Sequence, residues 1–168
     1  NEGISMLQLA NDALEEMTET VFGLREHMNQ FMLRGGDSDQ LSSLWTGGMQ
    51  RIDAIAKDTV FQNYHLLDGS IDFVVLTIGT GTHERDRFDL DIFVLEATCS
   101  SLGLASDNTG SGLFLQSAEV GILRRSSASL GRALEELRLK REHIKRCHMQ
   151  LSAAFTELRL DEERLQSD

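Results

Sequence analysis

An apolar residue recurs at every seventh position through the last third of the chain. The column runs without a break through Leu123, Leu130, Leu137, Ile144, Leu151, Leu158 and Leu165. Side chains seven residues apart lie close to two helical turns apart and share one face, so the repeat predicts one long helix with an apolar seam. At about 1.5 Å per residue this seam is roughly 65 Å long. A compact globule of 168 residues cannot cover it, so we expect its partner to be another long helix.

A second heptad seam opens the chain. Its apolar residues alternate spacings of three and four, and its central positions are Leu7, Leu14, Val21 and Met28. This period predicts a long helix over residues 1–33. We expect Gly35 and Gly36 to end it, because glycine readily adopts the left-handed conformation of a helix C-cap.

The next helix is predicted over residues 39–59. The stretch from Asp37 to Asp39 offers a side-chain N-cap, and apolar residues at helical spacing follow it, among them Trp45 and Ile52. Gly47 and Gly48 lie in the middle of this helix, where a glycine costs roughly 1 kcal/mol relative to alanine. We therefore expect the helix to bend or loosen at these two residues.

The pattern changes from helical to alternating after Phe61. Residues 71–78 are rich in β-branched and aromatic side chains, and apolar and polar residues alternate from Phe88 to Val94. These features predict a β-hairpin over residues 71–95 with a long tip. A linker rich in Ser, Gly, Asn and Asp is predicted over residues 96–112, and the long helix of the C-terminal seam over residues 113–166.

The predicted fold is mainly α: an elongated antiparallel helical bundle, or coiled-coil rod, of three long helices with a small β-hairpin. The chain forms a single domain over residues 1–168. Because the first and last helices each carry a heptad seam, we expect them to lie antiparallel with the seams facing each other. Two strands alone are marginally stable in water, so the hairpin is expected to pack on the helices.

Composition excludes several classes of partner. The formal net charge is −11 at pH 7, whereas nucleic acids and anionic membranes attract a basic surface, so neither is an expected partner. No run of eighteen apolar residues is present, and the first residues have neither the basic nor the apolar part of a signal peptide. The chain opens without Met, and we expect it to be a fragment of a longer protein.

Several motifs carry a chemical interpretation beside a structural one. His143, Cys147 and His148 have residue types and spacing that suit zinc, but Cys147 falls in the seam and is favoured as a core residue, as is Cys99. Asp89 and Asp91 share a strand face and could bind Ca²⁺, although a solvated face is favoured. The glycines at 79 and 81 suggest a phosphate loop, yet no Lys-Ser/Thr pair follows them and a hairpin loop is favoured.

One basic cluster stands out in this acidic chain. It consists of Lys140, Arg141, Lys145 and Arg146. We expect it to contact the acidic first helix or a neighbouring subunit. We find no nucleophile–base pair, metal set or cofactor loop, and we predict neither an enzyme nor a bound cofactor.

An ordered series of short motifs is similar to flagellin. Residues 1–8, NEGISMLQ, resemble the segment that opens the first helix of the flagellin filament core, and Leu24, Arg25, Glu26 and Gln30 continue the match. Residues 51–53 and 59–63 resemble the end of the family's second helix. Residues 78–90 and 101–104 resemble its hairpin and the segment behind it, while the C-terminal helix matches more loosely.

The resemblance implies a structural subunit of the bacterial flagellar filament, in its first core domain. It implies export through the flagellar channel without a cleaved signal peptide, an extracellular location and a role in motility. The implied partners are neighbouring copies and the flagellar junction and cap proteins. The segments that line the inner tube and a large variable domain are missing from the chain, so we expect this fragment to be monomeric.

The resemblance also marks a surface read by the innate flagellin receptor of animals. The equivalent positions are Gly23, Arg25, Glu26, His27, Gln30 and Arg51. Gly23 stands where the family has Arg, His27 where it has Leu, and Arg51 near the place of a Glu. Because a guanidinium and an aliphatic anchor are lost, we expect weak or no receptor activation.

Two other functions compete with the filament subunit. A hook–filament junction protein of the same superfamily would share this core. A helical coiled-coil adaptor is the third hypothesis, and the hairpin between the second and last helices argues against it.

Overall fold

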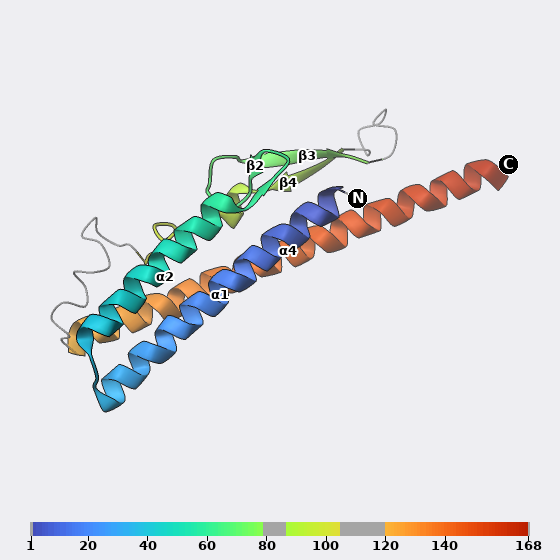
Figure 1. Ribbon diagram of the computed structural model, residues 1–168. Helices are drawn as coiled ribbons and strands as arrows, with labels where there is room; N and C mark the ends of the chain where they lie inside the picture. Colours follow the sequence, from blue (N-terminus) through green and yellow to red (C-terminus); the bar gives the residue numbers. More distant parts are fainter. Residues whose placement is uncertain (1, 79–86, 105–119, 168) are drawn as a thin grey trace.

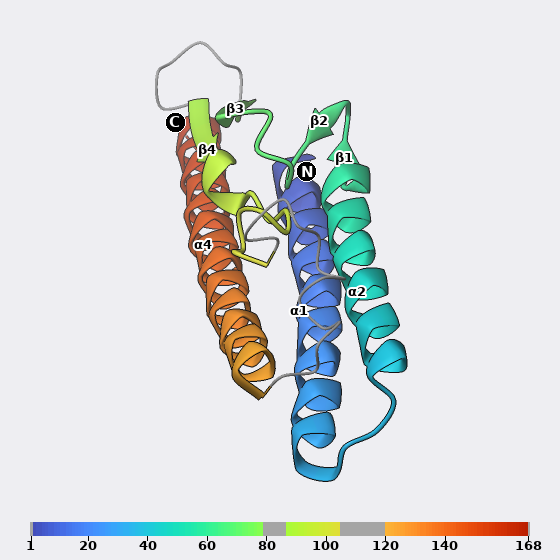
Figure 2. The ribbon, with the colours of Figure 1, turned by 90° about the vertical axis from the view of Figure 1, so that its left-hand side faces the viewer.

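Three long helices lie side by side in an elongated bundle (Figure 1). The computed structural model describes residues 2–78, 87–104 and 120–167. Helix α1 spans Glu2–Arg34, α2 spans Ser38–Asp58 and α4 spans Val120–Ser167. Helix α1 lies between the other two and runs antiparallel to both (Figure 2). The predicted mainly α fold with a small β-hairpin is therefore confirmed.

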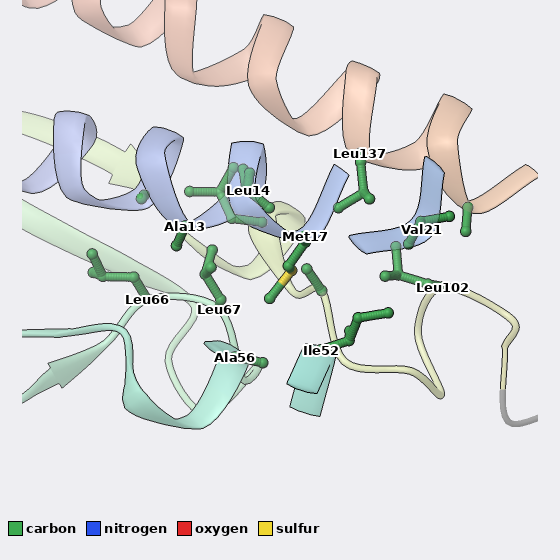
Figure 3. Packing of buried hydrophobic residues seen from close by; sticks show 14 of the residues in the cluster. Ala13, Leu14, Met17, Val21, Ile52, Ala56, Leu66, Leu67, Leu102 and Leu137 are labelled. Carbon is green, nitrogen blue, oxygen red and sulfur yellow. The ribbon is translucent and has the colours of Figure 1, made fainter. Parts of the chain in front are cut away.

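Helix α1 supplies the centre of the core. Its heptad positions Leu14, Met17 and Val21 are completely buried, because α4 covers one side of the helix and α2 covers the other. Figure 3 shows Leu14 and Met17 between Leu137 of α4 and Ala56 of α2. A helix that is covered on two sides must carry a wide apolar stripe. The apolar residues of α1, spaced three and four positions apart in the sequence, form this stripe.

A short turn with two caps connects α1 to α2. The N–H of Gly35 donates to the carbonyl of Phe31 at 2.8 Å, and Gly35 has φ +70°, as a left-handed C-cap requires. The Asp37 carboxylate then accepts the N–H of Asp39 at 2.9 Å, which caps α2 and satisfies one of its free donors.

Helix α2 continues through Gly47 and Gly48, contrary to the expected loosening. The physical reason is close packing on α1. A Cβ placed on Gly48 would lie 2.5 Å from Cδ1 of Leu24, so the absence of a side chain lets the two helices approach. The conformational cost of this glycine is offset by the contact it permits.

In the part of the chain that the structure describes, the β-structure consists of two small antiparallel hairpins. Strands β1 (Val60–Phe61) and β2 (Tyr64–His65) form the first, which the sequence did not predict. The turn between them places Gln62 and Asn63 at φ 48° and 71°, the conformation of a tight hairpin turn. Strands β3 (Phe73–Thr77) and β4 (Arg87–Asp91) form the second, with Phe73 opposite Asp91.

The second hairpin is shorter than the predicted range of residues 71–95. Residues Phe93–Leu95 form a 3₁₀ turn, η2, and not the end of a strand. The N–H groups of Ile92 and Phe93 both donate to the carbonyl of Asp72 at 2.9 Å, which closes the ladder. The N–H of Leu95 then donates to the carbonyl of Ile92 at 2.9 Å, and this hydrogen bond closes the 3₁₀ turn. The predicted tip, residues 79–86, lies outside the described residues.

The segment predicted as a linker over residues 96–112 is packed where the structure describes it. Ala97, Cys99, Leu102 and Leu104 are all buried. The N–H of Cys99 donates to the Asp53 carboxylate at 2.8 Å, which ties this segment to α2. Because the segment is mostly polar, its sequence did not indicate that these four apolar side chains form a buried face. Residues 105–112 of the predicted linker lie outside the described part.

The C-terminal seam is buried over most of its length but not at its end. Leu123, Leu130, Leu137, Ile144 and Leu151 are buried, Leu158 is half-buried and Leu165 is 78% exposed. Gly3, at the start of α1, faces Leu151, because a Cβ on Gly3 would lie 2.8 Å from Cδ2 of that residue. Leu165 therefore lies outside the core of this structure, and the prediction that it is a core residue was wrong. The predicted start at residue 113 lies outside the described residues.

A pair of leucine truncations tests how the core is distributed. We expect Leu14→Ala to lower the free energy of unfolding by about 2–5 kcal/mol, because it leaves a cavity between α1 and α4. The matched change Leu165→Ala is expected to alter it by less than about 0.5 kcal/mol, because that side chain is already in water. Urea unfolding followed by circular dichroism measures both. Equal effects of the two changes would contradict this arrangement.

Candidate functional site

The described residues contain no group of three or more His, Cys, Asp or Glu side chains that could hold a metal ion. None of the helices described is long and apolar enough to cross a lipid bilayer. The described surface of the bundle carries two grooves along α1 and a hollow on the second hairpin.

The three residues that were weighed as zinc ligands and then set aside, His143, Cys147 and His148, are only partly brought together. His143 Nε2 donates to the carbonyl of Asp91 at 3.1 Å and lies 3.5 Å from Cys147 Sγ. His148 instead lines the groove between α1 and α4. Burial raises the pKa of the Cys147 thiol, which keeps it protonated and makes it a poor metal ligand or nucleophile.

Cys99 is also a buried thiol. Its Sγ donates to the carbonyl of Met49 at 3.2 Å and lies 3.6 Å from Met49 Sδ. Burial, followed by the nearby Asp53 carboxylate, raises the pKa of Cys99 to about 12. Both cysteines are therefore packing residues of the core in this structure.

The outer face of the second hairpin combines aromatic rings with carboxylates. Phe73 and Phe93 are more than half exposed, and together with Asp72, Asp89 and Asp91 they line a hollow of about 380 Å³. Asp89 and Asp91, for which a solvated strand face was favoured over Ca²⁺ binding, are both exposed. The sequence did not predict this hollow, because Asp72 and Phe93 are far apart in the sequence and meet only where the hairpin closes.

The predicted basic cluster does not act as one unit. The Lys140 ammonium donates to the carbonyl of Val94 at 3.3 Å and lies 3.7 Å from the Glu136 carboxylate. The Arg141 guanidinium donates to the Asn11 side chain of α1 at 3.4 Å. Lys145 and Arg146 are exposed. One member thus contacts the first helix, one contacts the hairpin and two point outward.

The positions equivalent to the receptor surface lie on α1 and α2. Glu26, His27 and Gln30 are exposed and Gly23 is half-buried with open space around it. The guanidinium carbon of Arg25 lies 3.7 Å from the place of a Cβ on Gly131 in α4, so Arg25 faces α4.

Arg51 belongs to a different contact from the other receptor-equivalent residues. It forms an ion pair with Glu16 across the α1–α2 junction. This pair borders a groove of about 690 Å³ between the two helices, which Leu9 and Ile55 also line. The sequence could not have shown this pair, because its members are 35 residues apart.

A second groove follows the other side of α1. It has a volume of about 510 Å³, Leu7 and Ile144 contribute to its floor, and Asn11, Arg141 and His148 line it. The glycine pair at 79 and 81 lies outside the described residues. The described residues thus form an elongated helical bundle that carries grooves along α1 and exposed side chains along its helix faces.

Comparisons with known proteins agree with this architecture. No family model matches the chain. It is 27% identical over 110 residues to Flagellin 1 of Proteus mirabilis, a match that covers 64% of this chain and 29% of that protein. The crystal structure of Bacillus cereus flagellin superposes with a TM-score of 0.71 at 16% identity, covering 93% of this chain and 85% of that one. The chain is thus similar to flagellins in sequence and shares their fold, as the motif series predicted.

Proposed function

We propose that this chain is the core part of a structural subunit of the bacterial flagellar filament, located outside the cell and serving motility. The observation that carries the proposal is the agreement of two comparisons: a flagellin fold along 93% of the chain and a sequence match to a flagellin over 64% of it. The matched part spans 29% of that flagellin. Assembly into a filament is therefore proposed for the whole protein to which this chain corresponds.

The mechanism that we propose is mechanical. Helices α1 and α4 act as an antiparallel coiled-coil rod, because both place apolar residues at heptad spacing and bury them in one shared core. α2 and the hairpins brace this rod along its length. A subunit of this kind resists bending and presents fixed helix faces to its neighbours, so its work requires no catalytic group and no cofactor.

The filament subunit is preferred to the two alternatives. The named relatives are both flagellins, which favours it over a hook–filament junction protein. A generic coiled-coil adaptor would not be expected to carry a packed hairpin beside its helices. Neighbouring copies, junction proteins and cap proteins are the proposed partners of the full-length subunit, with export through the flagellar channel. The 168-residue fragment is proposed to be monomeric under ordinary conditions.

Flagellar filaments sheared from the organism that encodes the chain test this proposal. We expect mass spectrometry of the sheared filaments to detect its peptides, and deletion of its gene to shorten or remove the filaments seen by electron microscopy. A cell with unchanged filaments after deletion, together with no such peptides in the sheared material, would reject the filament role.

We also propose that the innate flagellin receptor of animals responds weakly to this protein. Gly23 cannot donate the charge-assisted hydrogen bonds of an arginine, and exposed His27 replaces an aliphatic contact. In a reporter-cell assay, we expect the double change Gly23→Arg and His27→Leu to increase activation, because the space around Gly23 accepts a side chain. Strong activation by the unchanged protein at nanomolar concentration would contradict the proposal.

A further inference from the structure

Two side chains of α4 bind the end of the second hairpin. The Lys140 ammonium donates to the carbonyl of Val94 at 3.3 Å, and His143 Nε2 donates to the carbonyl of Asp91 at 3.1 Å. A carbonyl oxygen only accepts, so His143 must carry a proton on Nε2. Because Lys140 and His143 are three residues apart, they lie on one face of the helix. Both hydrogen bonds hold the place where β4 passes into the turn η2.

The carbonyl of Asp91 points away from the partner strand. The N–H of Ile92 donates to the carbonyl of Asp72, on the side of β3, at 2.9 Å. In a trans peptide the N–H and the preceding C=O point in opposite directions, so the carbonyl of Asp91 faces outward from β4. An outward carbonyl at the edge of a sheet is open to pairing with another chain. His143 satisfies this carbonyl and covers that end of the β4 edge.

The second hairpin has few polar connections to the helices. Across the described ranges, the contacts of Lys140 and His143 are the only hydrogen bonds that join residues 71–78 and 87–95 to a helix. The two hairpins also form separate two-stranded sheets, and a pair of strands alone is marginally stable in water. The second hairpin therefore depends on its contacts with the bundle.

Apolar packing supplies the other part of this attachment. Val74, Leu90 and Ile92 are buried and belong to the common core. The hydrophobic effect is non-directional, so it holds the hairpin against the bundle without fixing its angle. Hydrogen bonds weaken steeply when they are misaligned, so the two donors of α4 can fix that angle.

The surroundings of Lys140 suit a structural role. Its side chain is only 12% exposed, although it ends in a charged ammonium. Burying a charge is costly unless it is paired and hydrogen-bonded. The ammonium meets both conditions, because it lies 3.7 Å from the Glu136 carboxylate and donates to the Val94 carbonyl. Losing the contact with Val94 would leave this ammonium short of a partner, which favours the attached hairpin.

We propose that Lys140 and His143 form a latch that fixes the second hairpin to α4, and that the hairpin opens locally when the latch is lost. The latch keeps the exposed rings of Phe73 and Phe93 in one orientation relative to the helices. This inference goes beyond the filament proposal and does not depend on it, because it concerns how one copy of the chain holds its own hairpin.

Hydrogen–deuterium exchange of the full 168-residue chain tests the latch. The double variant Lys140→Met and His143→Leu keeps apolar bulk at both positions and removes both donors. We expect the amides of residues 73–77 and 87–95 to exchange roughly tenfold faster in this variant, because local opening exposes them. The amides of residues 7–24 in α1 are expected to keep the protection of the unchanged chain, whereas a general loss of stability would accelerate both regions.

Two matched variants separate the latch from effects of charge and size. The pair Lys140→Arg and His143→Gln retains a donor at each position, and we expect it to restore slow exchange of the hairpin. The pair Lys145→Met and His148→Leu removes the same two residue types at the same spacing along α4, in the groove beside α1. We expect this second pair to leave the exchange of the hairpin unchanged.

Circular dichroism checks that each variant is helical. If the double variant loses its helical signal, Lys140→Met and His143→Leu are measured one at a time, and a smaller acceleration is expected from each.

Three outcomes would overturn the latch. They are hairpin amides that are unprotected in the unchanged chain, hairpin exchange in the folded double variant equal to that of the unchanged chain, and acceleration of α1 by the same factor as the hairpin. The filament experiment above has a separate readout. If the peptides occur in filaments while the exchange of the hairpin does not change, the latch is rejected and the filament function stands.

Discussion

The burial of α1 between α2 and α4 is the interaction on which the rest of the structure depends. Leu14, Met17 and Val21 are removed from water on a single helix that touches both neighbours. At roughly 1.5–3 kcal/mol for each large apolar side chain, this stripe provides much of the driving force for assembly of the bundle. Leu66, Leu67 and Leu102, which come from segments outside the three helices, join this core.

The periodicity of the sequence was sufficient to predict the helices, because a helix that is buried along a stripe must repeat apolar residues every three or four positions. Leu165 shows where this reasoning fails. The heptad repeat continues past Leu151. A repeat indicates only that a residue can be buried, because burial also requires another segment of the protein packed against that position. Gly3, at the start of α1, faces Leu151, and Leu165 lies further along α4, but the sequence of α4 does not contain that information.

Other features depended on contacts between distant residues and were not predictable from local patterns. Gly48 appeared to weaken α2, yet it permits the approach of Leu24. The segment around Cys99 appeared to be a polar linker, yet Asp53 anchors its backbone. The exposed surface residues predicted on α1 lie where a heptad places them. The ion pair of Arg51 with Glu16 became visible only in the folded chain. The same is true of the separate environments of Lys140, Arg141 and the exposed pair Lys145 and Arg146.

The central claim is that pairing with α1 stabilises α4, and hydrogen–deuterium exchange along α4 tests it most directly. Amides of opened or unsupported helix exchange quickly, whereas those in a packed core are protected. We expect strong protection over residues 123–151 and rapid exchange over residues 159–167, which are almost all exposed. Equal protection of both stretches would show that α4 does not depend on α1, and would contradict the account.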